Sequence, residues 1–302
     1  MSSLSSAELA ASKPRPRAAA PAASAAGLTV YLYDGIGQPW FSVEAVRGYV
    51  AEWVPWVRTE VRGDLLAEAV AGIRQQPCRQ ATLAGLAEKL CQARTVNPAE
   101  TASPRRRRIL KPEMDFERHL LAGSTRAVPG VVYDGLDLQL IAFGMVARTE
   151  LGPEAIHVWF TERPIATWDD ASRRYHARVS LYGLPSIVSA SGMVQAPALE
   201  REQYLARRLG LWPSEAGAPS GSHRLVYEDP RTTEVAKGYA MQALFYALTG
   251  DPFCDDPRCR LFNAHWQLEM LAAQLGGAEF CAAHRERLLA WQAGWSDRVK
   301  LC

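Results

Sequence analysis

Three of the six cysteines in this 302-residue chain lie close together near its C-terminal end, and a histidine follows the last of them. The pattern is Cys-x4-Cys, then 21 residues, then Cys-x2-His, and its members are Cys254, Cys259, Cys281 and His284. Two close pairs of thiolate and imidazole ligands suit a closed tetrahedral zinc site that leaves no position for water. The sequence therefore predicts a structural zinc held by these four residues, the Cys/His cluster; the alternative is three ordinary buried thiols beside a surface histidine.

The segments around this cluster are expected to be helical. Asp229-Pro230 supplies a capping residue and a proline suited to the first helical position, before a long apolar-periodic run that ends at Gly250. The first cysteine pair follows this helix in a loop rich in proline and aspartate. Further helices are predicted over 263–275 and 282–295, so the second pair opens the last helix.

The N-terminal part of the folded chain alternates between strand and helix patterns. A β-branched and aromatic run at 28–34 stops at Asp-Gly, and Ser42 can then cap a helix with apolar residues at helical spacing. A second strand near 57–61 and a helix over 65–73 follow. This alternation predicts a layered α/β domain.

The centre of the chain is rich in strand patterns after a mostly helical stretch at 82–130. Strands or strand-like segments are predicted at 131–133, 138–143, 155–160, 176–181 and 187–194, a helix at 200–211, and a loop at 217–222.

Composition limits the classes of function. The chain is 48% hydrophobic, and 34 Lys and Arg face 32 Asp and Glu, so the overall charge gives no reason to expect a nucleic-acid partner. No stretch approaches the roughly 20 apolar residues of a membrane span. We predict a cytoplasmic protein with an Ala/Ser/Pro-rich disordered tail at 1–26, an organellar transit peptide being the alternative for that segment, and a single domain at 27–302.

The C-terminal motif resembles that of the archaemetzincins, a zinc metallopeptidase family with a compact zincin-like fold. Their active-site helix and following loop contain H-E-x-x-H-x-x-G-x-x-H-C, a further cysteine five positions on, and a later C-x-x-C. In this register Gly250 takes the glycine position, Cys254 and Cys259 take the first two cysteine positions, and Cys281-x-x-His284 replaces the closing pair. The resemblance implies a compact zincin-like α/β (α+β) fold, with a mixed sheet, packed helices and a zinc-stapled C-terminal loop region.

The same register places residues without ligating side chains where the family has its catalytic groups. These are Ala243 and Leu244 for the leading His-Glu, Ala247 and Phe253 for the other two histidines, and Leu261 for a methionine after the second cysteine. In the family the histidines hold zinc and the glutamate activates water. The resemblance therefore implies a pseudoenzyme with no catalytic residues, whose former substrate groove binds a peptide or protein.

The alternative function is an atypical zinc-dependent hydrolase or peptidase with ligands elsewhere. Asp115 with His119, and His265 with Glu269, have the i to i+4 spacing of two ligands on one helical face, although such pairs are commonly exposed ion pairs. His157 and His176, on predicted strands, are expected to be hydrogen-bonded core or edge residues.

Three further features of the sequence are typical of binding surfaces. The polar and aromatic groups at 161–163 and 168–175 form a candidate surface for a peptide or small ligand, or an ordinary salt-bridged turn. Gly35-Ile36-Gly37 fails as a phosphate loop because Trp40 stands where a third glycine is needed. Four consecutive arginines at 105–108 would serve a nucleic-acid adaptor, but such a run is more often a solvated loop.

Overall fold

The structure is a computed structural model that describes residues 27–73, 75–95, 108–128, 130–198, 224–277 and 279–299. The predicted tail at 1–26, helix at 200–211 and loop at 217–222 lie outside these residues, as do three of the four arginines at 105–108. The first half of the chain contains β1 (Thr29–Gly35), α1 (Val43–Trp53), β2 (Arg58–Arg62), α2 (Leu65–Ala71), α3 (Gln76–Gln92), α4 (Lys111–Leu121), β3 (Tyr133–Asp134), α5 (Gly135–Phe143) and the short 3-10 helix η2 (Arg148–Glu150). The second half contains β4 (Ala155–Thr161), β5 (Ile165–Asp169), β6 (Arg174–Arg178), β7 (Ser180–Leu181), β8 (Ser186–Ser189), α6 (Ala190–Gln195), α8 (Thr232–Thr249), α9 (Gln267–Leu271), the π-helical turn η3 (Ala272–Gly276) and α10 (Ala282–Val299).

Five strands form the central sheet in the order β2-β1-β4-β8-β7. The pairs β1/β2, β1/β4 and β4/β8 are parallel, and β7 runs antiparallel to β8 at one edge. A smaller sheet has the order β3-β5-β6. The mixed α/β fold predicted from the sequence is confirmed; the extent of the single domain stays a prediction.

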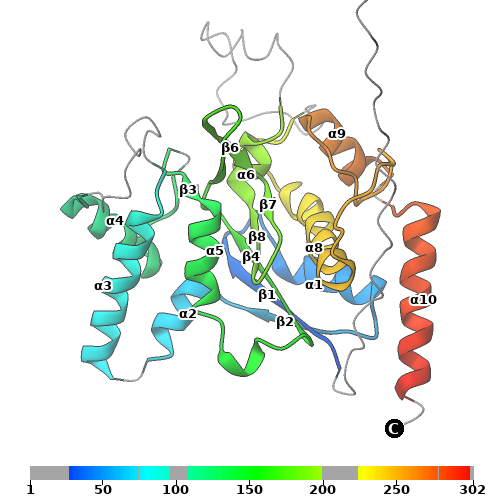
Figure 1. Cartoon of the computed structure of the whole chain (residues 1–302), viewed down its shortest axis with the longest axis horizontal. Helices are drawn as coiled ribbons and strands as arrows, with labels where there is room; N and C mark the ends of the chain where they lie inside the picture. The colour runs from blue at the N-terminus through cyan, green and yellow to red at the C-terminus, as the bar shows by residue number, and fades with distance from the viewer. Residues whose placement is uncertain are drawn as a thin grey trace, which may run out of the picture.

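Side chains that alternate along the strands divide the core into two layers. Leu32 and Phe160 pack with α1 and α8, whereas Tyr33 and Trp159 pack with α2, α3 and α5. Figure 1 shows α2, α3 and α5 on one side of the sheet and α1 and α8 on the other. The sheet is thus buried on both faces, as its near-continuous apolar strands require.

Two predicted strands differ from the structure, because one is a helix and the other is shorter than expected. Residues 138–143 belong to α5, because Asp134 caps that helix: its Oδ1 accepts from the amides of Leu136 at 3.0 Å and Asp137 at 3.1 Å. The predicted strand at 187–194 ends at Ser189, whose hydroxyl accepts from the amide of Gly192 at 2.9 Å and caps α6. In both places a capping side chain overrides an apolar run that also suits a strand.

The helices around the C-terminal motif differ from the prediction at their ends. α8 begins at Thr232, two residues after Pro230, and ends as expected at Gly250, which has φ +74°. The predicted helix at 263–275 is shorter, because it starts at Gln267 and passes into the π-helical turn η3. In the ranges that the structure describes, no helix combines the length and apolar character needed to cross a membrane.

Candidate metal centre and neighbouring cavities

The loop after α8 folds back on itself and so brings its two cysteines together. The amide of Cys254 donates to the carbonyl of Leu261 at 2.8 Å, and the amide of Cys259 donates to the carbonyl of Asp256 at 3.0 Å. Asp251, whose carboxylate accepts from the amide of Phe253 at 3.2 Å, shapes the start of the loop.

The second pair lies at the start of α10, next to this loop. The amide of Arg260 donates to the carbonyl of Glu279 at 2.9 Å, which ties the segment before α10 to the loop. The amide of Arg285 donates to the carbonyl of Cys281 at 2.9 Å, so Cys281 and His284 share the first turn of the helix. These contacts bring together in space two segments that lie about twenty residues apart in the sequence.

The ligand atoms of the Cys/His cluster all lie within 4.8 Å of one another. Cys254 Sγ is 3.8 Å from Cys281 Sγ, and His284 Nδ1 is 3.1 Å from Cys281 Sγ and 3.9 Å from Cys259 Sγ. Four ligands in a tetrahedron with metal–sulfur bonds of about 2.3 Å have edges of about 3.8 Å, so this arrangement fits one tetrahedral ion. The cluster could therefore hold a metal ion.

Backbone amides support the sulfur atoms. The amide of Asp256 points to Cys254 Sγ at 3.4 Å, and the amide of Cys281 points to Cys259 Sγ at 3.5 Å. Burial raises the pKa of the Cys254 thiol to about 12 and also raises the pKa of Cys259. Because a metal binds thiolates, metal binding at neutral pH would release these protons.

Arg260 anchors the loop to the two helices beneath it. Its side chain is 2% exposed, pairs with the carboxylate of Glu234 on α8, and lies 4.5 Å from the ring centre of Tyr49 on α1. The ring of His284 packs edge-on against Phe245 of α8 at 5.2 Å. The Cys/His cluster and its neighbours thus connect the loop, α8, α1 and α10.

The positions that the archaemetzincin register assigns to catalysis carry no potential ligands. Ala243 and Leu244 are buried in the core, and Ala247 is exposed. Phe253 is 38% exposed and packs against Tyr182, with 5.9 Å between ring centres. Within the described ranges, the Cys/His cluster is the one group of three or more potential ligand atoms that lie together.

A cavity of about 160 Å³ lies between the middle of α8, the loop that follows this helix and the antiparallel edge of the sheet. Its walls include Ser180 of β7, Gln242 of α8 and Phe253. The hydroxyl of Tyr182 donates to Gln242 Oε1 at 2.5 Å and so holds the sheet edge to the helix. This cavity is called the edge groove below.

Comparison with known proteins places the chain in a family. A model described as "Family of unknown function (DUF7001)" matches residues 32–287, which is most of the chain. The chain belongs to DUF7001.

The fold of this DUF7001 chain is also similar to a solved structure. The crystal structure of archaemetzincin from Methanopyrus kandleri matches with a TM-score of 0.40 and 12% sequence identity, over 87% of this chain and 94% of that chain. No curated protein matches the sequence.

The other predicted metal-binding pairs of the DUF7001 chain are not brought to a third ligand among the described residues. Asp115 accepts from Lys111 Nζ at 2.7 Å on the exposed side of α4. Glu269 Oε2 accepts from the amides of His265 and Trp266, each at 3.1 Å, and so stabilises the start of α9. Both acidic residues therefore have structural contacts.

The two histidines expected on strands are hydrogen-bonded, as predicted. Buried His157 contacts Tyr33 Oη through Nδ1 and the carbonyl of Glu150 through Nε2, both at 2.9 Å. His176, on the edge strand β6, contacts Ser172 Oγ at 2.8 Å. Neither belongs to the metal centre.

The predicted ligand surface divides into two separate parts. Thr161, Glu162 and Arg163 line a cavity of about 380 Å³ with the loop that follows β1. Residues 168–175 form the β5–β6 hairpin, where Trp168 packs on Tyr175, and line neither this cavity nor the edge groove. Asp64 also lines this cavity, which could not be predicted from the sequence. Asp64 lies about a hundred residues from Arg163, and its sequence context indicates only a helix cap.

Proposed function

We propose that this DUF7001 chain is a non-catalytic relative of the archaemetzincins, in which a structural zinc staples the C-terminal segments to α8 and the edge groove binds an extended peptide or protein segment. One observation carries the proposal: the four ligands of the Cys/His cluster converge, while the aligned catalytic positions on α8 and its loop bear alanine, leucine and phenylalanine.

Zinc is the metal that suits this ligand set best. Three thiolates and one imidazole are soft to borderline ligands, which disfavours calcium and magnesium, and a closed tetrahedral set is typical of structural zinc. The set leaves no coordination position for water. A metal held in this way supplies folding free energy and does not activate a nucleophile.

The loss of catalysis is inferred from the chemistry of the aligned positions. Alanine, leucine and phenylalanine neither bind zinc nor accept a proton, so Ala243, Leu244, Ala247 and Phe253 cannot replace the His-Glu machinery of the resembled family. Tyr182 also packs against both Tyr246 and Phe253, each with 5.9 Å between ring centres. Phe253, which takes the position of the third histidine in the resembled motif, thus belongs to an aromatic cluster.

The edge groove supports binding of an extended segment through the backbone of β7. The carbonyl of Val179 accepts from the amide of Ser189 in β8 at 2.8 Å, so the backbone hydrogen-bonding groups of Val179 point toward β8. Since successive residues of an antiparallel strand alternate, Ser180 directs its own N–H and C=O to the open edge. A peptide strand can pair there, with its side chains between β7 and α8.

The zinc part of the proposal is tested by elemental mass spectrometry of purified protein. We expect one zinc per chain in the wild type, none in the double variant Cys254→Ser, Cys259→Ser, and one in Cys78→Ser, a matched change at an exposed thiol of α3. A wild type without zinc would refute the structural site. A second zinc that survives the double substitution, together with chelator-sensitive cleavage of peptides, would favour the hydrolase alternative.

The groove is tested with peptides selected on the wild-type protein from a random phage-displayed library. Ser180→Pro removes the amide that faces the open edge, and the same peptides should bind this variant at least tenfold more weakly. Ser180→Ala keeps the amide and should bind them equally well. Phe253→Ala, at the other wall, gives a second readout if the proline variant does not fold. Peptides that bind all four proteins alike would place the binding surface elsewhere.

A further inference from the structure

The cavity next to Arg163 lies at the carboxyl ends of the parallel strands β1 and β4, beside the start of α2. In open α/β sheets this edge is where small molecules commonly bind. Gly35 forms part of its floor, and a Cβ there would lie 2.5 Å from Asp64 Oδ2 and 2.6 Å from the carbonyl of Phe160. The absence of a side chain at residue 35 thus lets Asp64 and β4 close around the cavity.

Arg163 presents unused hydrogen-bond donors in this cavity. Its side chain is 6% exposed, and its Nη1 donates to Glu117 Oε2 at 2.9 Å and to Tyr133 Oη at 2.7 Å. Its Nε and Nη2 have no hydrogen-bond partner among the described residues, and neither atom is sealed from solvent. A buried guanidinium with two free donors can hold a carboxylate in a bidentate manner.

Arg163 shares its buried counter-charge, Glu117, with a second guanidinium group. Glu117, which is fully buried, is shared between Arg163 and Arg94, whose Nη2 lies 2.6 Å from Glu117 Oε1. Arg94 has a second acidic neighbour, since its Nη1 lies 3.8 Å from Glu113 Oε1, whereas Arg163 has, in the part of the chain that the structure describes, only its share of Glu117. An anionic group of a ligand would give Arg163 an ion-pair partner that it does not share, in a site with little water.

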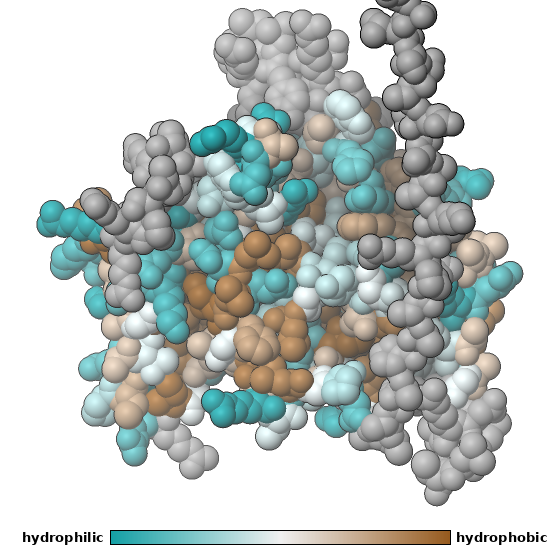
Figure 2. Space-filling model, in the orientation of Figure 1, coloured by the Kyte–Doolittle hydropathy of each residue, from teal (hydrophilic) through white to brown (hydrophobic). Residues whose placement is uncertain are grey.

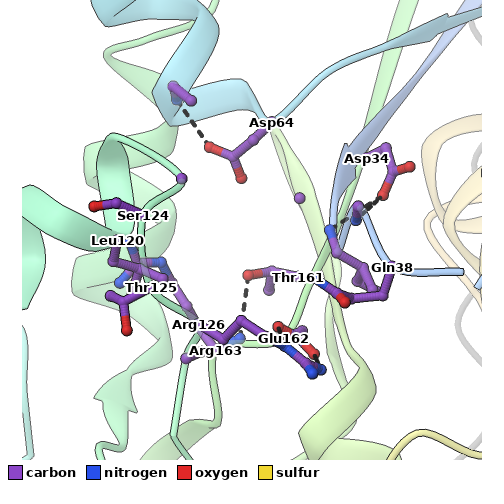
Figure 3. A pocket seen from close by; sticks show the side chains of 16 residues that line it. Asp34, Gln38, Asp64, Leu120, Ser124, Thr125, Arg126, Thr161, Glu162 and Arg163 are labelled. Atoms are coloured by element: carbon purple, nitrogen blue, oxygen red, sulfur yellow. Dashed lines mark hydrogen bonds and ion pairs between the residues drawn. The ribbon is translucent and has the colours of Figure 1, made fainter.

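An acceptor faces Arg163 from the other side of the cavity. Asp64 extends from the start of α2, and Figure 3 shows one of its oxygens bound to the helix while the other points into the space between Asp64 and Thr161. That second oxygen, Oδ2, also accepts from Trp159 Nε1 at 3.1 Å. Within the described ranges, no ion pair joins Asp64 to a cationic side chain.

The remaining charged groups at the cavity are already paired. Arg126 binds the carboxylate of Glu162 and also contacts Glu228 Oε1 at 2.7 Å, so both acids at the rim are ion-paired with it and the three groups together carry one negative charge. Asp34 turns its carboxylate to its own loop and accepts from the amides of Ile36 and Gly37. The charged groups that can bind a ligand in the cavity are therefore the cationic Arg163 and the anionic Asp64, with the Thr161 hydroxyl between them (Figure 3).

We propose that this cavity binds a small zwitterion of the amino-acid type, with its carboxylate on Arg163 and its ammonium group on Asp64. A site with one buried cationic pole and one anionic pole discriminates against simple anions and simple amines, because each would leave one pole unpaired. Apolar carbons of the ligand would contact Ile36, Ala67 and Leu120. This site is separate from the edge groove and does not depend on the metal.

The test is isothermal titration calorimetry on the full chain with probes of increasing charge separation: alanine, β-alanine, 4-aminobutyrate and the dipeptide Ala-Ala. Propionate, propylamine and inorganic phosphate are the single-charge probes. We expect at least one zwitterion to bind at least tenfold more tightly than all three. Equal or tighter binding of propionate or phosphate would overturn the zwitterion, as would the absence of binding by all four zwitterions.

Asp64→Asn is the decisive variant, because asparagine keeps the helix-capping oxygen and removes only the charge. The bound zwitterion should lose at least tenfold in affinity. Asp134→Asn is the matched control, since Asp134 caps α5 through the same pair of amide contacts and lies outside the cavity. Ala67→Phe, which narrows the cavity, should also abolish binding. Unchanged affinity in both Asp64→Asn and Ala67→Phe would contradict the proposal.

Discussion

The Nδ1 atom of His284 lies 3.1 Å from the Sγ atom of Cys281, three residues earlier in the chain. In the register of the resembled motif, His284 takes the position of the fourth cysteine. His284→Ala should weaken zinc binding by more than the roughly 10- to 100-fold that loss of a supporting residue costs, because a ligand itself is removed. His284→Cys should restore it. Titration with a competing chromophoric chelator measures both, and equal affinity of the wild type and His284→Ala would remove His284 from the ligand set.

A pH dependence follows from the burial of His157. Burial is the largest influence on this ring and lowers its pKa; the hydrogen bond to Glu150 acts in the opposite direction. The folded chain therefore favours the neutral ring, whereas the unfolded chain protonates it below about pH 6.5. This contribution to stability is present above that pH and is lost as the pH falls toward the lowered pKa of the folded state.

Urea unfolding between pH 7.5 and 5.5 measures this contribution. His157→Gln should lower the stability at pH 7.5 and reduce the loss of stability between the two pH values. His119→Gln changes an exposed histidine of α4 and controls for the removal of any histidine. A pH slope in His157→Gln that equals the wild-type slope would show that other groups account for the acid sensitivity.

The parts of the fold that could be predicted from the sequence are those in which pattern and burial agree. In β1, Val30 and Leu32 alternate with Tyr31 and Tyr33, and every one of these side chains packs on a core layer, so strand propensity and tertiary packing favour the same structure. The end of α8 at Gly250 could also be predicted from the sequence, because glycine readily adopts the φ of +74° found there. The prediction failed at 138–143, where an apolar run without polar punctuation suits a strand or a helix and Asp134 decides between them.

The metal centre and the zwitterion cavity differ in how far the sequence reveals them. Cysteine is rare and its ligand spacings are local, so the Cys/His cluster could be predicted from two short segments. The cavity depends on Asp64 and Arg163, which the parallel pairing of β1 with β2 and β4 brings to one edge of the sheet. A single sequence gives each of them only a local role, as a helix cap and as part of a polar turn.

Two glycines in helices should respond to alanine with opposite signs. At Gly192 of α6 a Cβ would lie 2.2 Å from the carbonyl oxygen of Arg178 and 3.0 Å from Cα of Val179, both backbone atoms at the edge groove. Gly192→Ala should cost about 1–3 kcal/mol and weaken peptide binding. At Gly48 of α1 a Cβ would meet nothing within 4 Å, so Gly48→Ala should stabilise the helix by up to about 1 kcal/mol. Thermal unfolding of the two variants beside the wild type tests the direction of each stability change. Stabilisation by Gly192→Ala would show that β6 can move away from α6.

Glu117 should be among the most sensitive positions of the second core layer. Its carboxylate is fully buried and accepts from Arg94, from Arg163 and from the hydroxyl of Tyr133 at 2.6 Å. Glu117→Gln leaves the buried guanidinium group of Arg163 without an ion-pair partner and leaves Arg94 with only the more distant Glu113, and breaking a buried pair in this way costs about 3–5 kcal/mol. The matched surface change Glu44→Gln, which breaks the exposed pair with Arg47, should cost less than about 1 kcal/mol. Urea denaturation separates these values. Similar small losses for both variants would mean that water reaches Arg94 and Arg163 when Glu117 is neutral, and in that case Arg163 would also be too well solvated to distinguish a zwitterion from a simple amine.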